Sequence, residues 1–140
     1  MCPLLTCVCH TCHALSQLGN IAGDGRDTRD AVLRVGTVPA LLGLLSSEPC
    51  RVSLMRNATW AVSNCVRGGP SWEAVERTLP VLKGVIAKET DVEVLTDAVR
   101  TIIAHHENTC GALSCRCTHW SSGRSVCCFC LAVLGSVLPL

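Results

Sequence analysis

The chain has 140 residues, and its 12 lysines and arginines nearly balance 11 aspartates and glutamates, so the formal net charge is +1. This length suits one ordinary domain or a few units of a repeat architecture. The near-neutral charge provides no global electrostatic field that would attract nucleic acid or an acidic membrane surface, so a partner must be bound by local chemistry.

Composition divides the chain into three stretches. Residues 1–13 are rich in cysteine and show no hydrophobic period. Residues 14–107 carry almost all the charge and space their apolar residues as α-helices do. Residues 108–140 are again rich in cysteine and apolar residues, and we expect them to be poorly ordered. The fold is therefore predicted from the middle stretch.

The middle stretch contains one helical pattern twice. Each unit has a short helix, a second helix with a proline in its first turn, and a long third helix. In the first unit these helices are predicted at 28–35, 38–47 and 53–67. In the second unit they are predicted at 71–78, with Ser71 as N-cap, and at 79–88 and 92–106. The glycine-rich segments "AGDG" (22–25) and "RGGP" (67–70) end long helices and turn the chain.

Equivalent residues of the units lie about forty positions apart. Pro39 aligns with Pro80 at an offset of 41, and Asn20 aligns with Asn64 at an offset of 44. A period near forty with three helices per unit is typical of armadillo repeats, whereas HEAT repeats have two helices. We therefore predict an all-α fold, an armadillo-repeat α-solenoid. It would be a fragment of a right-handed superhelix with about two full repeats and partial flanking helices.

Three phrases of the middle stretch resemble the importin-α family of armadillo-repeat nuclear import adaptors. They are "LGNIAGDGRDTRDAVL" (18–33), "LMRNATWAVSNCVRG" (54–68) and "EVLTDA" (93–98). The resemblance covers about residues 14–101. It implies a groove, lined by the long helices, that binds lysine-rich nuclear localisation signals of cargo proteins. It also implies a non-enzymatic protein of the cytoplasm and nucleus that needs no cofactor.

Six residues form the predicted peptide-binding site: Asn20, Asp24, Asn57, Trp60, Asn64 and Asp97. The resemblance implies that the amides hold the main chain of an extended peptide, because a carboxamide both donates and accepts hydrogen bonds. The indole would receive a lysine stem, with a cation–π attraction of about 0.5–2 kcal/mol, and the carboxylates would pair with lysine ammonium groups. Three of the six are three or four positions apart on the helix at 53–67, so they share one face.

Departures from the family pattern predict weakened binding. Ser16 and Arg100 stand where the family has groove tryptophans, and Ala104 stands where it has an amide or a tyrosine. Losing two aromatic contacts of about 1 kcal/mol each would lower the affinity roughly thirtyfold. Arg100 would also repel a basic peptide. We further expect no importin-β binding, because no basic segment precedes the first repeat.

Several motifs have other interpretations. "CHTCH" (9–13) fits covalent haem attachment, but no export signal accompanies it. Two groups could supply zinc ligands without forming paired C-x-x-C knuckles: Cys7, Cys9, Cys12 and His13, and Cys115, Cys117, Cys127, Cys128 and Cys130. The apolar run at 126–140 is shorter than the ~18–20 residues that span a bilayer. We expect incidental cysteines in a reducing compartment, no bound metal, and no membrane or nucleic-acid partner.

The predicted function is a cargo-binding adaptor. The alternative is an armadillo scaffold fragment for protein–protein interaction, in which the same residues only pack. No phosphate-binding glycine loop, serine elbow or spaced carboxylate pair indicates catalysis. The adjacent His105 and His106 face different ways on a helix, so we interpret them as polar residues near a helix end.

Overall fold

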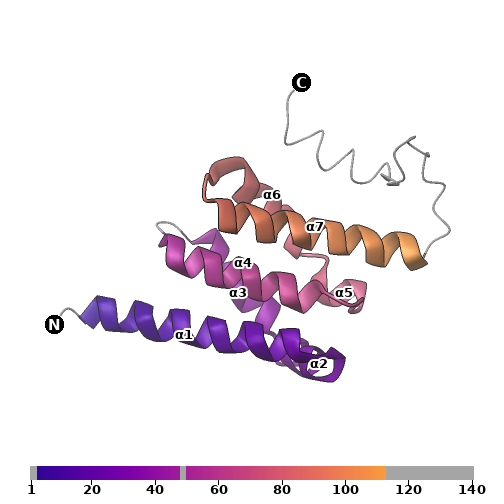
Figure 1. The fold of residues 1–140 in the computed structure, drawn as a ribbon, viewed down its shortest axis with the longest axis horizontal. Helices are drawn as coiled ribbons and strands as arrows, with labels where there is room; N and C mark the ends of the chain where they lie inside the picture. The colour runs from indigo at the N-terminus through magenta and orange to yellow at the C-terminus, as the bar shows by residue number, and fades with distance from the viewer. Residues whose placement is uncertain (1–2, 48–49, 113–140) are drawn as a thin grey trace.

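The computed structural model describes the backbone of residues 3–47 and 50–112 and the side chains of residues 9–47 and 50–105. Every regular element in this part of the chain is an α-helix. The helices are α1 (Pro3–Asp24), α2 (Arg26–Arg34), α3 (Thr37–Ser46), α4 (Val52–Val66), α5 (Trp72–Val75), α6 (Thr78–Lys88) and α7 (Val92–Ala112) (Figure 1). The all-α fold predicted from the sequence is confirmed.

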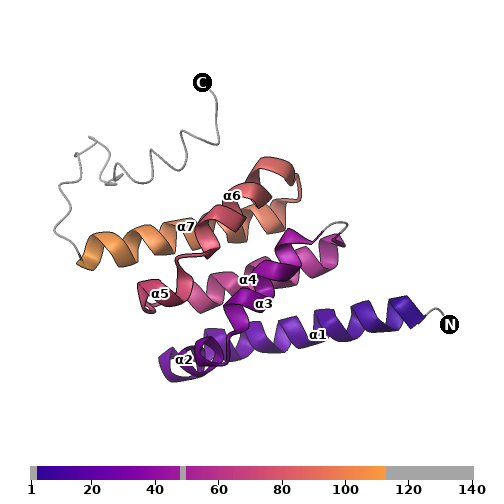
Figure 2. The same cartoon turned by 180° about the vertical axis from the view of Figure 1, so that it is seen from behind.

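The helices form two similar units. The long helices α1, α4 and α7 lie side by side and run in the same direction (Figure 1). From behind, α3 crosses α4 and α6 crosses α7, while the short α2 and α5 lie at one end (Figure 2). The order α2–α3–α4 is thus repeated as α5–α6–α7, and α1 takes the place of a preceding third helix. This is the armadillo arrangement that the forty-residue period predicts.

The core lies between the long helices and the layer behind them. Leu41 of α3, Val62 of α4 and Leu82 of α6 are at most 1% exposed. Full burial of such a side chain contributes about 1.5–3 kcal/mol relative to leaving it in water. Ala58 of α4 and Ala98 of α7 are also buried, and α4 packs against both α1 and α7. The core therefore holds the three long helices in a fixed row.

The turn after α4 depends on two glycines. Gly68 and Gly69 have φ angles of 76° and 74°, in the left-handed region that side chains with a Cβ avoid. The predicted "RGGP" turn is confirmed. Ser71 stands at the N-cap position of α5, as predicted, but its side chain makes no capping hydrogen bond.

Two helices extend beyond the predicted limits. Helix α1 begins at Pro3, so the boundary predicted between residues 13 and 14 lies inside it. Residues 4–18 contain no glycine or proline, so nothing in that stretch breaks a helix. Helix α7 continues to Ala112, past the predicted helix end at residue 106 and the predicted end of the middle stretch at residue 107. Most of the tail that we expect to be poorly ordered, residues 108–140, lies outside the described residues.

None of the helices within residues 3–47 and 50–112 is both long and apolar enough to cross a membrane. The apolar run at 126–140, which was considered above as a short membrane segment, lies outside the described residues.

Candidate functional site

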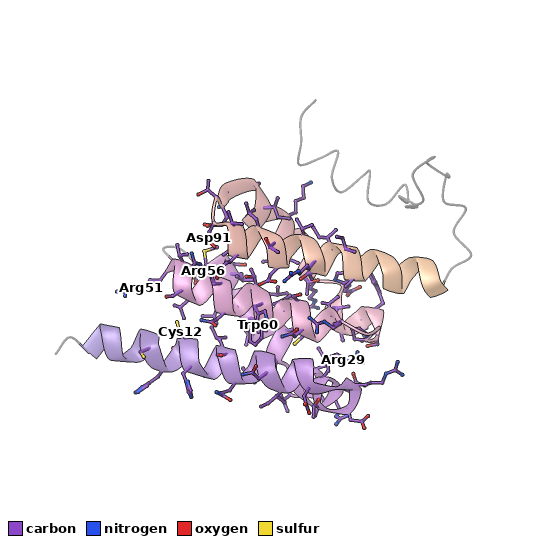
Figure 3. All side chains as sticks on the ribbon, in the orientation of Figure 1. Cys12, Arg29, Arg51, Arg56, Trp60 and Asp91 are labelled. Atoms are coloured by element: carbon purple, nitrogen blue, oxygen red, sulfur yellow. The ribbon has the colours of Figure 1, made fainter. Side chains whose placement is uncertain are left out.

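Two shallow pockets lie along the face formed by α1, α4 and α7, and Trp60 lines both. The α1/α4 pocket, of about 310 Å³, is lined by Gly19, Asn20, Gly23, Asp24, Trp60, Asn64 and Arg67. The α4/α7 pocket, of about 270 Å³, is lined by Arg56, Asn57, Trp60, Val92, Glu93, Thr96, Asp97 and Arg100. All six residues singled out from the sequence therefore line one pocket or both. Figure 3 shows Trp60 in the middle of this face, between α1 and α4.

Trp60 is half-buried because its ring lies against the backbone of α1. A Cβ atom built on Gly19 would be 2.2 Å from Cζ3 of the indole and 2.5 Å from Cε3, far inside van der Waals contact. Only glycine at position 19 leaves room for the ring. One part of the indole thus packs against α1, and the remainder is the shared wall of the two pockets.

Asn64 connects α4 to α1. Its Nδ2 donates a hydrogen bond of 3.0 Å to the carbonyl oxygen of Gly19, and the residue is only 4% exposed. A Cβ on Gly23 would lie 3.3 Å from the same nitrogen, so a second glycine also gives the carboxamide access to the helix backbone. One donor of the predicted peptide-binding amide is therefore already used to hold two long helices together.

The other two residues that α1 contributes face solvent. Asn20 and Asp24 are exposed, and within the described part of the chain neither side chain forms a hydrogen bond or an ion pair. Asn20 lies one helical turn before Asp24, so both project from the same side of α1. Together with the exposed Arg67 on the α4 side, the α1/α4 pocket thus presents a carboxamide, a carboxylate and one guanidinium group beside the indole.

The α4/α7 pocket differs because its carboxylates are paired with arginines of the same chain. Arg100 contacts Asp97 at 3.2 Å on α7. Arg56 of α4 donates from Nε and Nη2 to Asp91, at 3.1 and 2.7 Å, and its Nη1 lies 3.2 Å from Glu93. Figure 3 shows Arg56 and Asp91 near the start of α7. The Arg56 pairs join α4 to the start of α7, and the Arg100 pair lies within α7; together they neutralise the acidic groups along the pocket.

Hydrogen bonding accounts for the pKa shifts in this cluster. The side-chain hydrogen bond from Arg56 lowers the pKa of Asp91, and a backbone N–H of Val94 adds to the effect. The same bond to Asp91 raises the pKa of Arg56.

Asn57, also in this pocket, donates from Nδ2 to the carbonyl oxygen of Ser53 at 2.9 Å. A cationic ligand must therefore compete with contacts that are already made.

His105 lies in the core, so its interpretation as a polar residue near a helix end is wrong. It is 1% exposed, and its Nε2 lies 2.6 Å from Oγ1 of Thr78. The Thr78 hydroxyl also lies 2.7 Å from the carbonyl oxygen of Val75, so Thr78 connects the imidazole to the backbone of α5. The Trp72 ring packs edge-on against the imidazole, with centroids 5.5 Å apart. Burial lowers the pKa of His105 to about 4.

The cysteines of the described part have different surroundings. Cys9 is exposed, Cys12 and Cys50 are half-buried, and Cys65 is buried. Desolvation by burial raises the pKa of Cys65 to about 11, which keeps its thiol protonated. Among the residues whose side chains are described, no group of three or more histidines, cysteines or acidic residues is arranged to hold a metal ion. The side chain of Cys7 and the cysteines after residue 105 lie outside that part.

Sequence reasoning missed Gly19, Gly23 and Arg56. Arg56 sits next to Asn57 in sequence, but its carboxylate partners lie 35 and 37 positions further along, so no local pattern reveals the pairing. A glycine four residues before another glycine on one helix face was the available signal for the close α1–α4 approach. The side chains that these glycines accommodate, Trp60 and Asn64, are known only from the tertiary structure, in which α4 lies beside α1.

Comparison with known proteins finds several similar importin subunits. The chain is 46% identical over 87 residues to importin subunit alpha-2 of Arabidopsis thaliana, which covers 61% of this chain and 16% of that protein. It is 45% identical over 87 residues to importin subunit alpha-1b of Oryza sativa, with the same coverage. It is 41% identical over 77 residues to importin subunit alpha-1 of Schizosaccharomyces pombe. No family model matches the chain. The chain thus spans about a sixth of the length of the curated relatives it matches.

Proposed function

Because the chain is related to the importin-α family over 61% of its length, we propose that the face of α1, α4 and α7 binds a lysine-rich nuclear localisation signal of a cargo protein. In this role the chain acts as part of a nuclear import adaptor that works between the cytoplasm and the nucleus. The observation that carries the proposal is the arrangement of the other five predicted residues around Trp60, in two adjoining pockets on one face.

The α1/α4 pocket supplies the chemistry for one lysine. The lysine stem lies against the part of the indole that α1 leaves uncovered, and its ammonium group reaches the exposed carboxylate of Asp24. The carboxamide of Asn20 is free to donate to and accept from the peptide main chain. Contacts to the main chain do not depend on the identity of the peptide side chains, so they position the peptide rather than select it.

The α4/α7 pocket contributes less to this binding. A lysine that approaches Asp97 must displace Arg100 or share its carboxylate, and Arg100 itself repels a basic peptide. Trp60 is the one indole on the face within the described part of the chain, so a lysine has one aromatic wall instead of two. We therefore propose weak binding that depends mainly on the α1/α4 pocket.

Fluorescence anisotropy of a labelled lysine-rich signal peptide tests this function. We expect saturable binding to the full chain, no binding of a matched peptide in which alanine replaces the lysines, and weaker binding to Trp60→Ala. The control is Trp72→Phe, which changes a tryptophan outside both pockets and should leave the affinity unchanged. Circular dichroism establishes that each variant keeps its helices. Absence of saturable binding to a folded chain would refute the proposal.

One observation favours the alternative, an armadillo scaffold fragment without affinity for cargo. Asn64 and Asn57 both use an amide donor inside the fold, and Trp60 packs against Gly19. If packing is their whole role, substitutions at these residues lower the stability of the fold and leave no peptide affinity to change. The same titration therefore separates the two functions.

A further inference from the structure

A third pocket, of about 350 Å³, lies between α2 and the start of α5, and it shares no residue with the two pockets of the α1, α4 and α7 face. Helices α2 and α5 lie at the same end of the molecule in both views (Figures 1 and 2). Its lining contains three arginines and one carboxylate: Arg26, Arg29, Arg34 and Asp30, together with Leu33, Gly69, Pro70, Ser71 and Ala74. The lining is therefore rich in positive charge.

The only carboxylate in this lining is already paired. Arg29 is 4% exposed and donates from Nε and Nη2 to Asp30, at 2.9 and 2.7 Å. Its Nη1 donates to the carbonyl oxygen of Arg67 at 2.6 Å. Arg26 and Arg34 are exposed, and neither forms an ion pair with any other described residue. Two guanidinium groups thus line the pocket without an ion-pair partner among the described residues.

Ser71 forms part of the opposite wall. It is exposed and directly follows the turn at Gly68, Gly69 and Pro70. Although it occupies the N-cap position of α5, its hydroxyl makes no capping hydrogen bond. The hydroxyl is therefore accessible on an exposed turn and is not needed to hold α5 in place.

We propose that Ser71 is a phosphorylation site whose phosphate is bound by Arg26 and Arg34. A protein kinase transfers the γ-phosphoryl group of a nucleoside triphosphate to Oγ. The Oγ–P bond forms, the bond from the γ-phosphorus to the bridging oxygen breaks, the hydroxyl proton passes to a base, and the nucleoside diphosphate leaves. The resulting phosphoserine carries about −1.5 to −2 charges and three acceptor oxygens that match guanidinium donors.

Phosphorylation would join the two repeats. Arg26 and Arg34 belong to α2 in the first unit, and Ser71 precedes α5 in the second, so the bound phosphate bridges the units on one side of the molecule. This inference does not depend on the proposed peptide binding.

The test uses the full chain with phosphoserine incorporated at position 71 and follows its ³¹P resonance through a pH titration. A free phosphomonoester has a second pKa of about 6. Neighbouring guanidinium groups favour the dianion, so we expect this pKa to be about 0.5 or more below that of the same phosphoprotein unfolded in urea.

Two double variants distinguish the pocket from the general charge of the protein. Arg26→Ala with Arg34→Ala should return the phosphate pKa to the value in urea. Arg51→Ala with Lys83→Ala removes two exposed cations outside the pocket and should leave the lowered value unchanged. Both pairs lie on the surface, so circular dichroism should show the helical signal retained. Equal pKa values in the folded and unfolded chain, or a lowering that survives the first double variant, would overturn the proposal.

Discussion

The α1/α4 and α4/α7 pockets share the wall formed by Trp60 but differ in their electrostatics. In the first, the carboxylate of Asp24 is exposed and forms no ion pair within the described part of the chain. In the second, Asp97 is paired with Arg100, and Arg56 pairs with residues at the start of α7. Two carboxylates on one face of the molecule can thus differ in availability: Asp24 is open to a cationic ligand, whereas Asp97 is held in an internal ion pair.

The difference limits what each pocket can contribute to binding. Asp97 is buried, but Arg56 and Arg100 remain exposed, and an ion pair open to solvent contributes only about 0.2–1 kcal/mol, so the pairs in the α4/α7 pocket hinder a cationic ligand without excluding it. The α1/α4 pocket needs no such displacement. Its geometry depends instead on close packing between α1 and α4 at Gly19, which makes it the more sensitive of the two to substitutions in the core.

The largest expected effect comes from filling the space at Gly19. In Gly19→Leu the new side chain collides with the Trp60 ring, so α1 must move away from α4 and the free energy of unfolding should fall by about 3 kcal/mol. Chemical denaturation followed by circular dichroism measures the change. In the matched variant Gly43→Leu the added Cβ has no neighbour within 4 Å, and stability should not fall. Equal losses of stability in the two variants would contradict the close packing of the Trp60 ring against Gly19.

A pH change should act on the second unit. The folded pKa of His105, about 4, lies below the ordinary value of about 6.5, so the unfolded chain binds a proton first as the pH falls. The contribution of neutral His105 to the free energy of unfolding is fully present above about pH 6.5 and is lost as the pH falls toward 4. Between pH 7 and pH 5 the free energy of unfolding should fall by about 2 kcal/mol. Denaturation curves at both pH values measure it. In His105→Gln the loss of unfolding free energy between pH 7 and pH 5 should be much smaller. An unchanged loss would mean that another group is responsible for it.

The carboxylate of Asp24 should matter for peptide binding. Asp24→Asn removes the proposed partner of a lysine ammonium group at an exposed site, so affinity for the lysine-rich peptide should fall about three- to fivefold. Peptide anisotropy measures the change. Asp27→Asn removes an exposed carboxylate that lines neither pocket and serves as the matched control. If both variants lose affinity equally, only the general charge of the protein attracts the peptide.

The smallest expected effect is a gain in the α4/α7 pocket. Arg100→Ala removes a repulsive charge and frees the carboxylate of Asp97, so peptide affinity should rise about two- to threefold. The matched control is Arg51→Ala, which removes an exposed arginine from outside the pocket. A salt titration provides a further test: the gain in peptide affinity should become smaller as the ionic strength rises, because salt screens the repulsion from Arg100. A loss of affinity in Arg100→Ala would show that this arginine contributes to binding.

Local sequence accounts for most of the fold. The helices of both repeats follow from 3.6-residue periodicity, first-turn prolines and the "RGGP" turn, and these signals act over a few residues. The row formed by Asn57, Trp60 and Asn64 follows from helix geometry alone. Helix α1 was underestimated because cysteines in place of the usual aliphatic residues obscured its period, although no residue within 4–18 breaks a helix.

The sequence by itself determined the order of the helices, their turns and the side chains that α4 presents together, because each depends on neighbours within one or two turns. Only the tertiary structure decided how those side chains are used. Asn64 bonds to a carbonyl oxygen 45 positions away, Arg56 pairs 35 positions away, and His105 becomes buried against α5 and α6. A polar or charged side chain can meet a distant partner or solvent, and which one it meets depends on the helix that packs beside it.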